Sequence, residues 1–411
     1  MNPSEKKIFR VRVQKETIEA FTGLSYMHEK TKKVVKLDGP SIAAEVRKAK
    51  FYQDASVLVR ERVTEKQEKS YIEVVEGDCL LEALRLKKQG FNPVVLNMAS
   101  ATSVGGGYKS GAGAQEENLF RRTNLFQYHE PNKSEWYPIP EFGGAYCPNA
   151  TVVRSSEPEN YAFLEVPETM SFVAVAALRR PKVIRDNSGE YTITPDANNK
   201  TRHKIRAILN IGLDNGHDAI VLSAFGCGAY KNPPKTIARL FYEVILTEYA
   251  GGDKDMPRTY KHISFAIIDD HNSKKKHNPE GNLYPFRMIF GNGGSLNAQG
   301  DNSALSPLRF FSNNRKKEGR KNNDRPKDES CEQKKRKSSN HQRSSHFQSS
   351  KQQSTLDEAW KHEPSRRPDD PINESSEKIH PEDNGGSNEG NGAVETKGEE
   401  DINADNDMLM G

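Results

Sequence analysis

The middle of the chain alternates short apolar runs with amphipathic helical patterns, and this alternation constrains the fold more than any other feature. The apolar runs predict buried strands over 71–75, 92–100, 171–178, 219–225 and 262–270. Helical patterns cover 78–90, 201–218 and 233–249. Strands that alternate with helices build a layered α/β sheet, largely parallel, with helices on both faces. The sequence therefore predicts one α/β unit.

Apolar residues are concentrated in the first 290 positions. Hydrophobic residues make up 34% of the chain, whereas folded domains carry roughly 45–50% with glycine counted. From Asn292 onward aliphatic residues are nearly absent, which is typical of disorder. We predict three parts: an N-terminal helical extension packed on the core (1–70), a core (71–291) and a disordered tail (292–411). Within the extension, Ser41 is expected to cap a helix.

The cysteine content and the apolar segments exclude several protein classes. The four cysteines are Cys79, Cys147, Cys227 and Cys331, and they form no CxxC pair. This spacing fits neither a disulfide framework nor a zinc site, and it suits a reducing compartment. The first residues lack the apolar stretch of a secretory signal, and no run of eighteen apolar residues is present. We therefore expect no membrane span.

Polar residues and glycines follow three of the predicted strands. They lie at 97–100, 226–228 and 269–272. Ligands of parallel sheets bind at the carboxyl ends of the strands, so these positions predict a nucleotide or phosphate site. The loop "FGCGAYKNPP" (225–234) stands between a strand and a helix, where backbone N–H groups can face an anion. A plain tight connection is the alternative, and the context favours phosphate binding.

A second glycine-rich stretch, "SVGGGYKSGAGAQEENLFRR" (103–122), leads into two adjacent glutamates. It matches neither the P-loop nor the dinucleotide fingerprint. The simplest interpretation is an exposed acidic helix start, with Arg121 as the i,i+4 partner of Glu117. However, adjacent side chains on a helix point in different directions, so Glu116 and Glu117 can also hold one ligand in two different roles.

The second interpretation is supported by a resemblance. The triple glycine, a seven-residue gap and "QEE" resemble the GGG-X(6–8)-QEE signature of the poly(ADP-ribose) glycohydrolases, and "VLNMAS" and "SAFGCGAYKNPP" are similar to their bacterial-type branch. The similarity spans roughly residues 15–290. It implies a macrodomain-like mixed sheet between helices, with an N-terminal helical extension, so that 71–291 is the catalytic core.

The resemblance implies a role for each matching residue. Glu117 is the catalytic acid/base, and Glu116 binds and orients the hydroxyls of the scissile ribose, with Gln115 supporting the pair. Asn97 contacts the distal ribose, and the loop of Gly105, Gly106 and Gly107 lets the backbone approach the ligand. The remaining positions bind the diphosphate or pack on the ligand: Gly226, Cys227, Gly228, Ala229, Tyr230 and Asn232.

These residues predict a glycosidase that releases ADP-ribose from poly(ADP-ribose) by cleaving ribose–ribose bonds. Ordinary glycosidases place two carboxylates on opposite sides of the bond, which adjacent glutamates do not do, so one residue serves as both acid and base. No metal and no cofactor are expected, and the substrates are the polymer and ADP-ribosylated proteins. We expect a monomer. Two alternatives remain: a hydrolase of mono-ADP-ribose conjugates, and a noncatalytic ADP-ribose reader.

The tail carries two short motifs. Basic clusters at 320–321 and 334–337 have the spacing of a bipartite nuclear-localisation signal, so we predict a nuclear protein, with a cytoplasmic pool also allowed. A solvated basic tract is the alternative. "QSTLDEAW" partly resembles a sliding-clamp-binding box through Gln353, Leu356 and Trp360. A generic helix that folds on binding is the alternative there.

Overall fold

The computed structural model describes residues 1–187, 189–251, 255–275, 278–291 and 294–295. The predicted basic clusters at 320–321 and 334–337, together with Gln353, Leu356 and Trp360, lie outside these residues. Among the described helices, none is long and apolar enough to cross a bilayer. In the same part of the chain, no group of three or more His, Cys, Asp and Glu side chains is placed to hold a metal ion.

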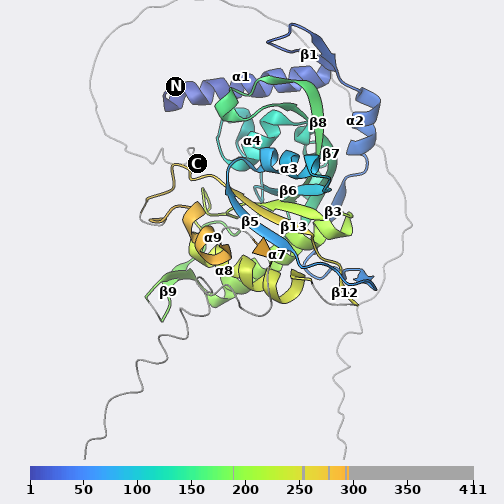
Figure 1. The fold of residues 1–411 in the computed structure, drawn as a ribbon. Coiled ribbons are helices and arrows are strands. Elements are labelled where there is room, and N and C mark those ends of the chain that lie inside the picture. The colour runs from blue at the N-terminus through green and yellow to red at the C-terminus, as the bar shows by residue number, and fades with distance from the viewer. Residues whose placement is uncertain (188, 252–254, 276–277, 292–293, 296–411) are drawn as a thin grey trace, which may run out of the picture. The chain divides into compact units, whose positions relative to one another are not determined.

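An eight-stranded sheet forms the centre of the described fold (Figure 1). Its strand order is β14 (Gly294–Ser295), β5 (Tyr71–Glu76), β13 (His262–Ile267), β11 (Ala219–Leu222), β6 (Pro93–Met98), β8 (Phe163–Val175), β7 (Gly144–Arg154) and β3 (Lys50–Tyr52). Neighbouring strands from β5 to β8 run parallel. The outer strands β14, β7 and β3 pair antiparallel with their neighbours. The predicted mixed α/β sheet is therefore confirmed.

Helices cover both faces of this sheet because alternate strand residues point to opposite sides. Val94 and Leu96 of β6 pack with one set of helices, and Val95 packs with the other. The first set comprises α7 (Pro195–Asp214), α8 (Pro234–Val244), which continues as a π-helical turn (Ile245–Tyr249), and α9 (Leu283–Phe290). The second comprises α1 (Pro3–Thr22), α3 (Cys79–Lys88), α4 (Gln115–Arg122) and α5 (Leu125–His129). Figure 1 shows the two sets on opposite sides of the strands.

The first 70 residues contain more strand than the sequence predicts. Besides α1 they form β1 (Ser25–Met27), β2 (Val34–Lys36), α2 (Gly39–Val46), β3 and β4 (Arg62–Val63). Strand β3 completes one edge of the central sheet by pairing with β7. The expected cap at Ser41 is wrong, because Asp38 caps α2 and its carboxylate accepts the N–H of Ser41 at 3.1 Å.

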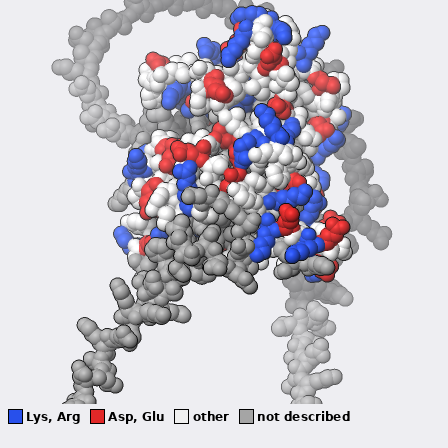
Figure 2. Space-filling model, in the orientation of Figure 1, with Lys and Arg blue, Asp and Glu red and all other residues white. Residues whose placement is uncertain are grey.

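The remaining elements are short. They are the 3₁₀ turns η1 (Tyr108–Ser110) and η2 (Glu157–Glu159), helix α6 (Lys133–Trp136), and strands β9 (Val183–Arg185), β10 (Tyr191–Ile193) and β12 (Met256–Pro257). The cysteines of the described residues, Cys79, Cys147 and Cys227, are buried, and no disulfide bond joins them. On the face drawn in Figure 2, basic and acidic side chains of the described residues are interspersed, in line with a net charge of only +4.

Candidate active site

Helix α4 is fixed to the end of strand β6 by its first residue. The Gln115 side chain accepts the N–H of Met98 at 2.9 Å and donates to the carbonyl of Leu96 at 2.6 Å. Through these two hydrogen bonds, the Gln115 side chain pairs with the backbone of β6 as a neighbouring strand would. The helix therefore starts at the carboxyl end of β6, which is the edge of a parallel sheet where ligands bind.

Glu116 and Glu117 are both buried at this helix start, with 4% and 6% of their surface exposed. Oε2 of Glu116 accepts the N–H of Ser100 at 2.8 Å, and Oε1 of Glu117 accepts the N–H of Gly107 at 2.9 Å. The other oxygen of each carboxyl group is buried without a hydrogen-bond partner among the described residues. Within the described part of the chain, one acceptor oxygen of each carboxyl group is therefore free to accept a hydrogen bond from a ligand.

The simpler interpretation of an exposed acidic helix start is therefore wrong. Arg121 does not pair with Glu117. Its guanidinium donates to the carbonyl of Ala112 at 2.8 Å and to the hydroxyl of Tyr161 at 3.2 Å. Arg121 is itself fully buried, so it serves the packing of α4, and no other cation of the described residues pairs with Glu117.

Burial raises the pKa of Glu116 well above its ordinary value, and the charge of Glu117 raises it further. The N–H of Ser100 opposes this shift because it favours the ionised form. Glu116 can therefore hold a proton at a pH where exposed glutamates are ionised.

The triple glycine makes room for these two side chains. Gly105 and Gly106 have φ of +61° and +56°, a conformation that favours glycine. A Cβ on Gly106 would collide with Oε1 of Glu117 and lie 3.1 Å from Oε2 of Glu116. The sequence predicts that the glycines let a ligand come close to the loop backbone. In the structure the glycines also let the loop itself come close to the two glutamates.

Asn97 lies at the end of β6 beside the pair. Its side chain is fully buried, and neither its oxygen nor its nitrogen has a hydrogen-bond partner among the described residues. The amide lies close enough to Glu116 to favour the ionised carboxylate. A buried amide without partners is unusual, and it marks Asn97 as available for a ligand.

The second predicted loop leaves the same edge of the sheet. Strands β11 and β6 are parallel neighbours, with Val221 opposite Val95, so the loop after β11 emerges next to Asn97. Gly226 has φ +72°, and a Cβ there would lie 2.6 Å from Nδ2 of Asn232.

Asn232 braces this loop from inside. Its Nδ2 donates to the carbonyls of Leu178 at 2.8 Å and Gly226 at 3.0 Å. The buried Asn232 side chain therefore fixes the loop, and this position is structural in the geometry that we observe.

The tip of the loop offers its backbone and not its thiol. The Cys227 side chain is buried in the core, and burial raises its thiol pKa. The N–H groups of Gly228, Ala229 and Tyr230 have no acceptor among the described residues. Three such N–H groups in succession can bind an anion, and the half-buried Tyr230 ring lies beside them.

The third polar strand end is largely structural. The Asp269 carboxylate accepts the N–H groups of Asn282 and Leu283 at 2.6 and 3.0 Å at the start of α9. Asp270 accepts both the N–H and the side chain of Asn272. Gly228 lies close to Asp270, because a Cβ there would be 3.4 Å from its carboxylate.

Comparison with known proteins shows which family the chain is similar to. Residues 14–154, which include the glutamates and the triple glycine, match the family described as microbial-type PARG, catalytic domain. The chain resembles the microbial-type poly(ADP-ribose) glycohydrolases. This match confirms the resemblance predicted from the sequence. A search of curated proteins finds no match.

Solved structures of poly(ADP-ribose) glycohydrolases have the same fold. The enzyme from Thermomonospora curvata is 25% identical, with a TM-score of 0.54, over 67% of this chain and 97% of that chain. The same enzyme bound to the inhibitor ADP-HPD is 26% identical, with a TM-score of 0.52, over the same shares.

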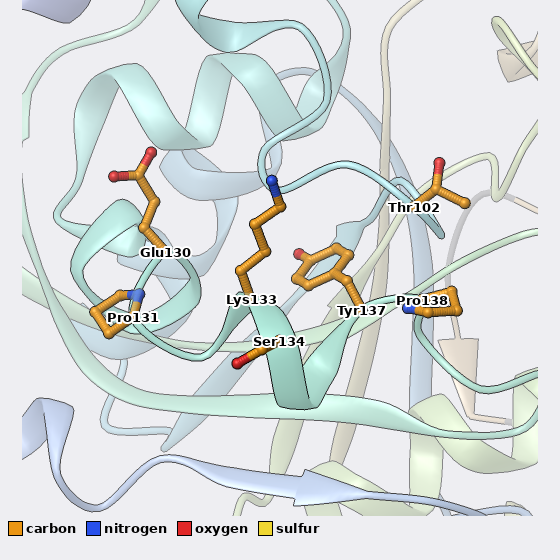
Figure 3. A pocket seen from close by; sticks show the side chains of 7 residues that line it. All are labelled: Thr102, Glu130, Pro131, Lys133, Ser134, Tyr137 and Pro138. Atoms are coloured by element: carbon orange, nitrogen blue, oxygen red, sulfur yellow. The ribbon is translucent and has the colours of Figure 1, made fainter. Parts of the chain in front are cut away.

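The structure also has a hollow that the sequence does not predict, and Figure 3 shows the residues that line it. Its volume is about 580 Å³, and its walls are Thr102 and six residues between Glu130 and Pro138. Tyr137 forms part of the wall, and its hydroxyl lies 2.9 Å from Nδ1 of His129. Burial lowers the pKa of His129 to about 3, so this ring is neutral. Burial, and then the charge of Glu116, raises the pKa of Tyr137.

Proposed function

We propose that this protein is a poly(ADP-ribose) glycohydrolase, which hydrolyses ribose–ribose O-glycosidic bonds and releases ADP-ribose. The observation that carries the proposal is the buried glutamate pair. Each carboxyl group uses one oxygen for a backbone N–H, and its other oxygen has no hydrogen-bond partner in the described part of the chain. The family match over 14–154 and the likeness to an enzyme bound to the inhibitor ADP-HPD support it.

Glu117 is the acid/base in this proposal. Its carboxyl group gives a proton to the leaving ribose oxygen as the bond from that oxygen to the anomeric carbon breaks, which leaves an oxocarbenium-like ribose. Water then adds to the anomeric carbon and returns a proton to Glu117. Glu116 accepts hydrogen bonds from the hydroxyls of the same ribose through its free oxygen. Both carboxyl groups stand at one helix start, so a single residue performs both proton transfers.

The fold fixes the orientation of the carboxyl groups. Burial and the charge of Glu117 favour the neutral form of Glu116, and carboxyl groups perturbed in this way are typical of functional sites. The N–H of Gly107 fixes Glu117, so its free oxygen points in a defined direction. Asn97, whose amide is unpartnered among the described residues, is placed to bind a ribose hydroxyl next to Glu116.

The diphosphate of the same unit binds the loop after β11. The N–H groups of Gly228, Ala229 and Tyr230 point to no acceptor of the described protein, and helix α8 begins shortly afterwards at Pro234. Backbone N–H groups and a helix N-terminus together attract phosphate. In this proposal the Tyr230 ring packs on the ligand.

The experiment compares wild type, Glu117→Gln and Glu65→Gln on automodified poly(ADP-ribosyl)ated protein, with free ADP-ribose as the readout. Glu65 is an exposed glutamate away from the site and serves as the matched control. We expect release by wild type and Glu65→Gln and none by Glu117→Gln, while calorimetry shows that all three bind ADP-ribose. If none of them releases ADP-ribose but all bind it, the protein is a reader and the enzyme proposal is wrong.

The nuclear location is a separate proposal that rests on the basic clusters at 320–321 and 334–337. A fluorescent fusion of the full chain should accumulate in nuclei, and replacement of 334–337 by alanines should abolish this. Equal distribution of both fusions would refute it. The sliding-clamp partner rests in the same way on Gln353, Leu356 and Trp360, and a pull-down with a Leu356→Ala control tests it.

A further inference from the structure

The hollow in Figure 3 is joined to the glutamate pair through shared structural elements. Thr102 belongs to the loop after β6, whose Ser100 N–H binds Glu116. The other wall is tied to this loop, because the N–H of Ile139 donates to the carbonyl of Ala101 at 2.8 Å. Tyr137 connects the hollow with the glutamate pair. Its ring forms part of the wall, and its pKa is raised by burial and, to a smaller extent, by the nearby charge of Glu116.

The glycine loop makes a second connection. The hydroxyl of Tyr108, which directly follows Gly107, donates to the Glu130 carboxylate in the wall. Gly107 in turn holds Glu117. Glu116 is thus connected to Thr102 through the loop after β6, and Glu117 is connected to Glu130 through Gly107 and Tyr108. In the proposed function, the hollow therefore flanks the residues that act on the terminal ribose.

The charges in the hollow leave a cation for a ligand. Although burial alone would raise it, Lys109 and Tyr108 hold the pKa of Glu130 below its ordinary value. Nζ of Lys109 lies 2.5 Å from Glu130, so this carboxylate is neutralised by an ion pair. The charge of Lys133 also lowers the pKa of Glu130, but Lys133 forms no ion pair with a carboxylate among the residues that the structure describes. Figure 3 shows its side chain standing between Glu130 and Tyr137.

The remaining walls suit a sugar. Thr102 and Ser134 bring hydroxyl groups, and Pro131, Pro138 and the ring of Tyr137 bring apolar surfaces. A volume of about 580 Å³ lies within the roughly 300–1,000 Å³ typical of small-molecule sites. Hydroxyl donors, apolar walls and one unpaired ammonium together fit a ribose that carries phosphate.

We propose that this hollow binds the sugar–phosphate of the second ADP-ribose unit, on the leaving-group side of the scissile bond. The inference rests on the proposed function, because the first unit occupies the glutamate pair and the loop after β11. Lys133 contacts a phosphate of the second unit, and the hydroxyl groups contact its ribose. The hollow thereby distinguishes polymer from a single ADP-ribose conjugate.

A binding experiment tests the site without turnover. In the Glu117→Gln background, we measure affinity for ADP-ribose and for a chain of two ADP-ribose units. The second unit should tighten binding about tenfold, the size expected for a hydrogen bond to a charged group. Lys133→Glu should remove this gain and leave ADP-ribose affinity unchanged. Lys133→Arg should keep the gain, and so should Lys88→Glu, which alters an exposed lysine at the end of α3.

Turnover provides the second measurement. In the otherwise wild-type protein, Lys133→Glu should raise the KM for polymer about tenfold. It should leave kcat/KM unchanged for an ADP-ribose glycoside with a small uncharged phenol as leaving group. A merely structural role would impair both substrates equally.

The outcomes separate this inference from the proposed function. Equal affinity for one and two units in the Glu117→Gln background overturns the second site, whatever the turnover. A gain that survives Lys133→Glu also overturns it. If the wild type hydrolyses neither substrate but the Lys133-dependent gain is present, the hydrolase proposal fails and the second site stands as part of a polymer reader.

Discussion

A methyl group added at Gly106 tests whether the glycine loop is there to hold the glutamates. Alanine at φ +56° costs about 1–2 kcal/mol of backbone strain, which lowers the melting temperature by roughly 2–8 °C. The new Cβ would also collide with Oε1 of Glu117, so the carboxyl group must move and lose its bond to Gly107. A displacement of about 1 Å at a reacting group costs roughly 100-fold in rate.

Gly216→Ala is the matched control for Gly106→Ala. Gly216 has φ +78°, and a Cβ there would meet nothing within 4 Å, so it reports the strain alone. We expect similar melting temperatures for the two variants, measured by calorimetry, but a loss of ADP-ribose release only for Gly106→Ala. If Gly106→Ala is destabilised like the control and keeps more than half of its activity, the argument that the loop positions Glu117 is wrong.

Three further substitutions test other parts of the fold. Because the pKa of Glu116 is raised in the folded protein, its ionisation destabilises the fold increasingly as the pH rises above the ordinary value of 4.5. Glu116→Gln should therefore raise the melting temperature at pH 8 and leave it unchanged at pH 4. An equal shift at both pH values would contradict this. Asn232→Ala removes both hydrogen bonds to the carbonyls of the loop after β11 and should lower the free energy of unfolding by about 1–3 kcal/mol. Calorimetry should also show weaker binding of ADP-ribose, and unchanged binding would refute the role of Asn232 in fixing this loop. Arg122 is buried and donates at 2.8 Å to both oxygens of Asp78. Arg122→Met should therefore lower the free energy of unfolding, measured with urea, by about 3–5 kcal/mol. A loss below about 1 kcal/mol would show that the ion pair is dispensable.

The parallel part of the sheet could be predicted because its strands are buried on both faces. Strands β6 and β11 therefore appear as continuous apolar runs, and the helices after them show clear periodicity. Helix α3 is the clearest example, since it spans Cys79–Lys88 within the predicted 78–90, and Asp78 caps it through the N–H groups of Leu80 and Leu81. Helix α7 begins at Pro195, ahead of the predicted start at 201, because Thr194 caps a first turn that carries few apolar residues.

The antiparallel edge could not be predicted in the same way. Strand β7 contains Pro148 and Asn149 in its middle, and both residues usually mark turns. The structure accommodates them with a register shift against β8 between Cys147 and Ala150, and Asn149 takes φ +44°. A bulge of this kind is specified by the partner strand, and a local pattern does not reveal it.

The hollow could not be predicted from the sequence for a related reason. Thr102 and the residues from 130 to 138 come together only because the two segments are joined across the fold by the bond between Ile139 and Ala101. No spacing within either segment indicates this contact. By contrast, the glutamate pair is contained in one motif, and its neighbour Asn97 ends a strand whose apolar run is plain in the sequence.

Burial of two adjacent carboxyl groups is the strongest physical argument for a chemical role at this site. A glutamate chosen for structure would be exposed or paired with a cation, since an unpaired buried carboxylate is costly. Glu116 and Glu117 are neither, because Arg121, the nearest candidate in the sequence, binds Ala112 and Tyr161 instead. Each keeps one oxygen without a partner among the described residues. Proteins tolerate such a cost mainly where function requires it, and ribose hydroxyls and a leaving oxygen are groups that would satisfy these two atoms.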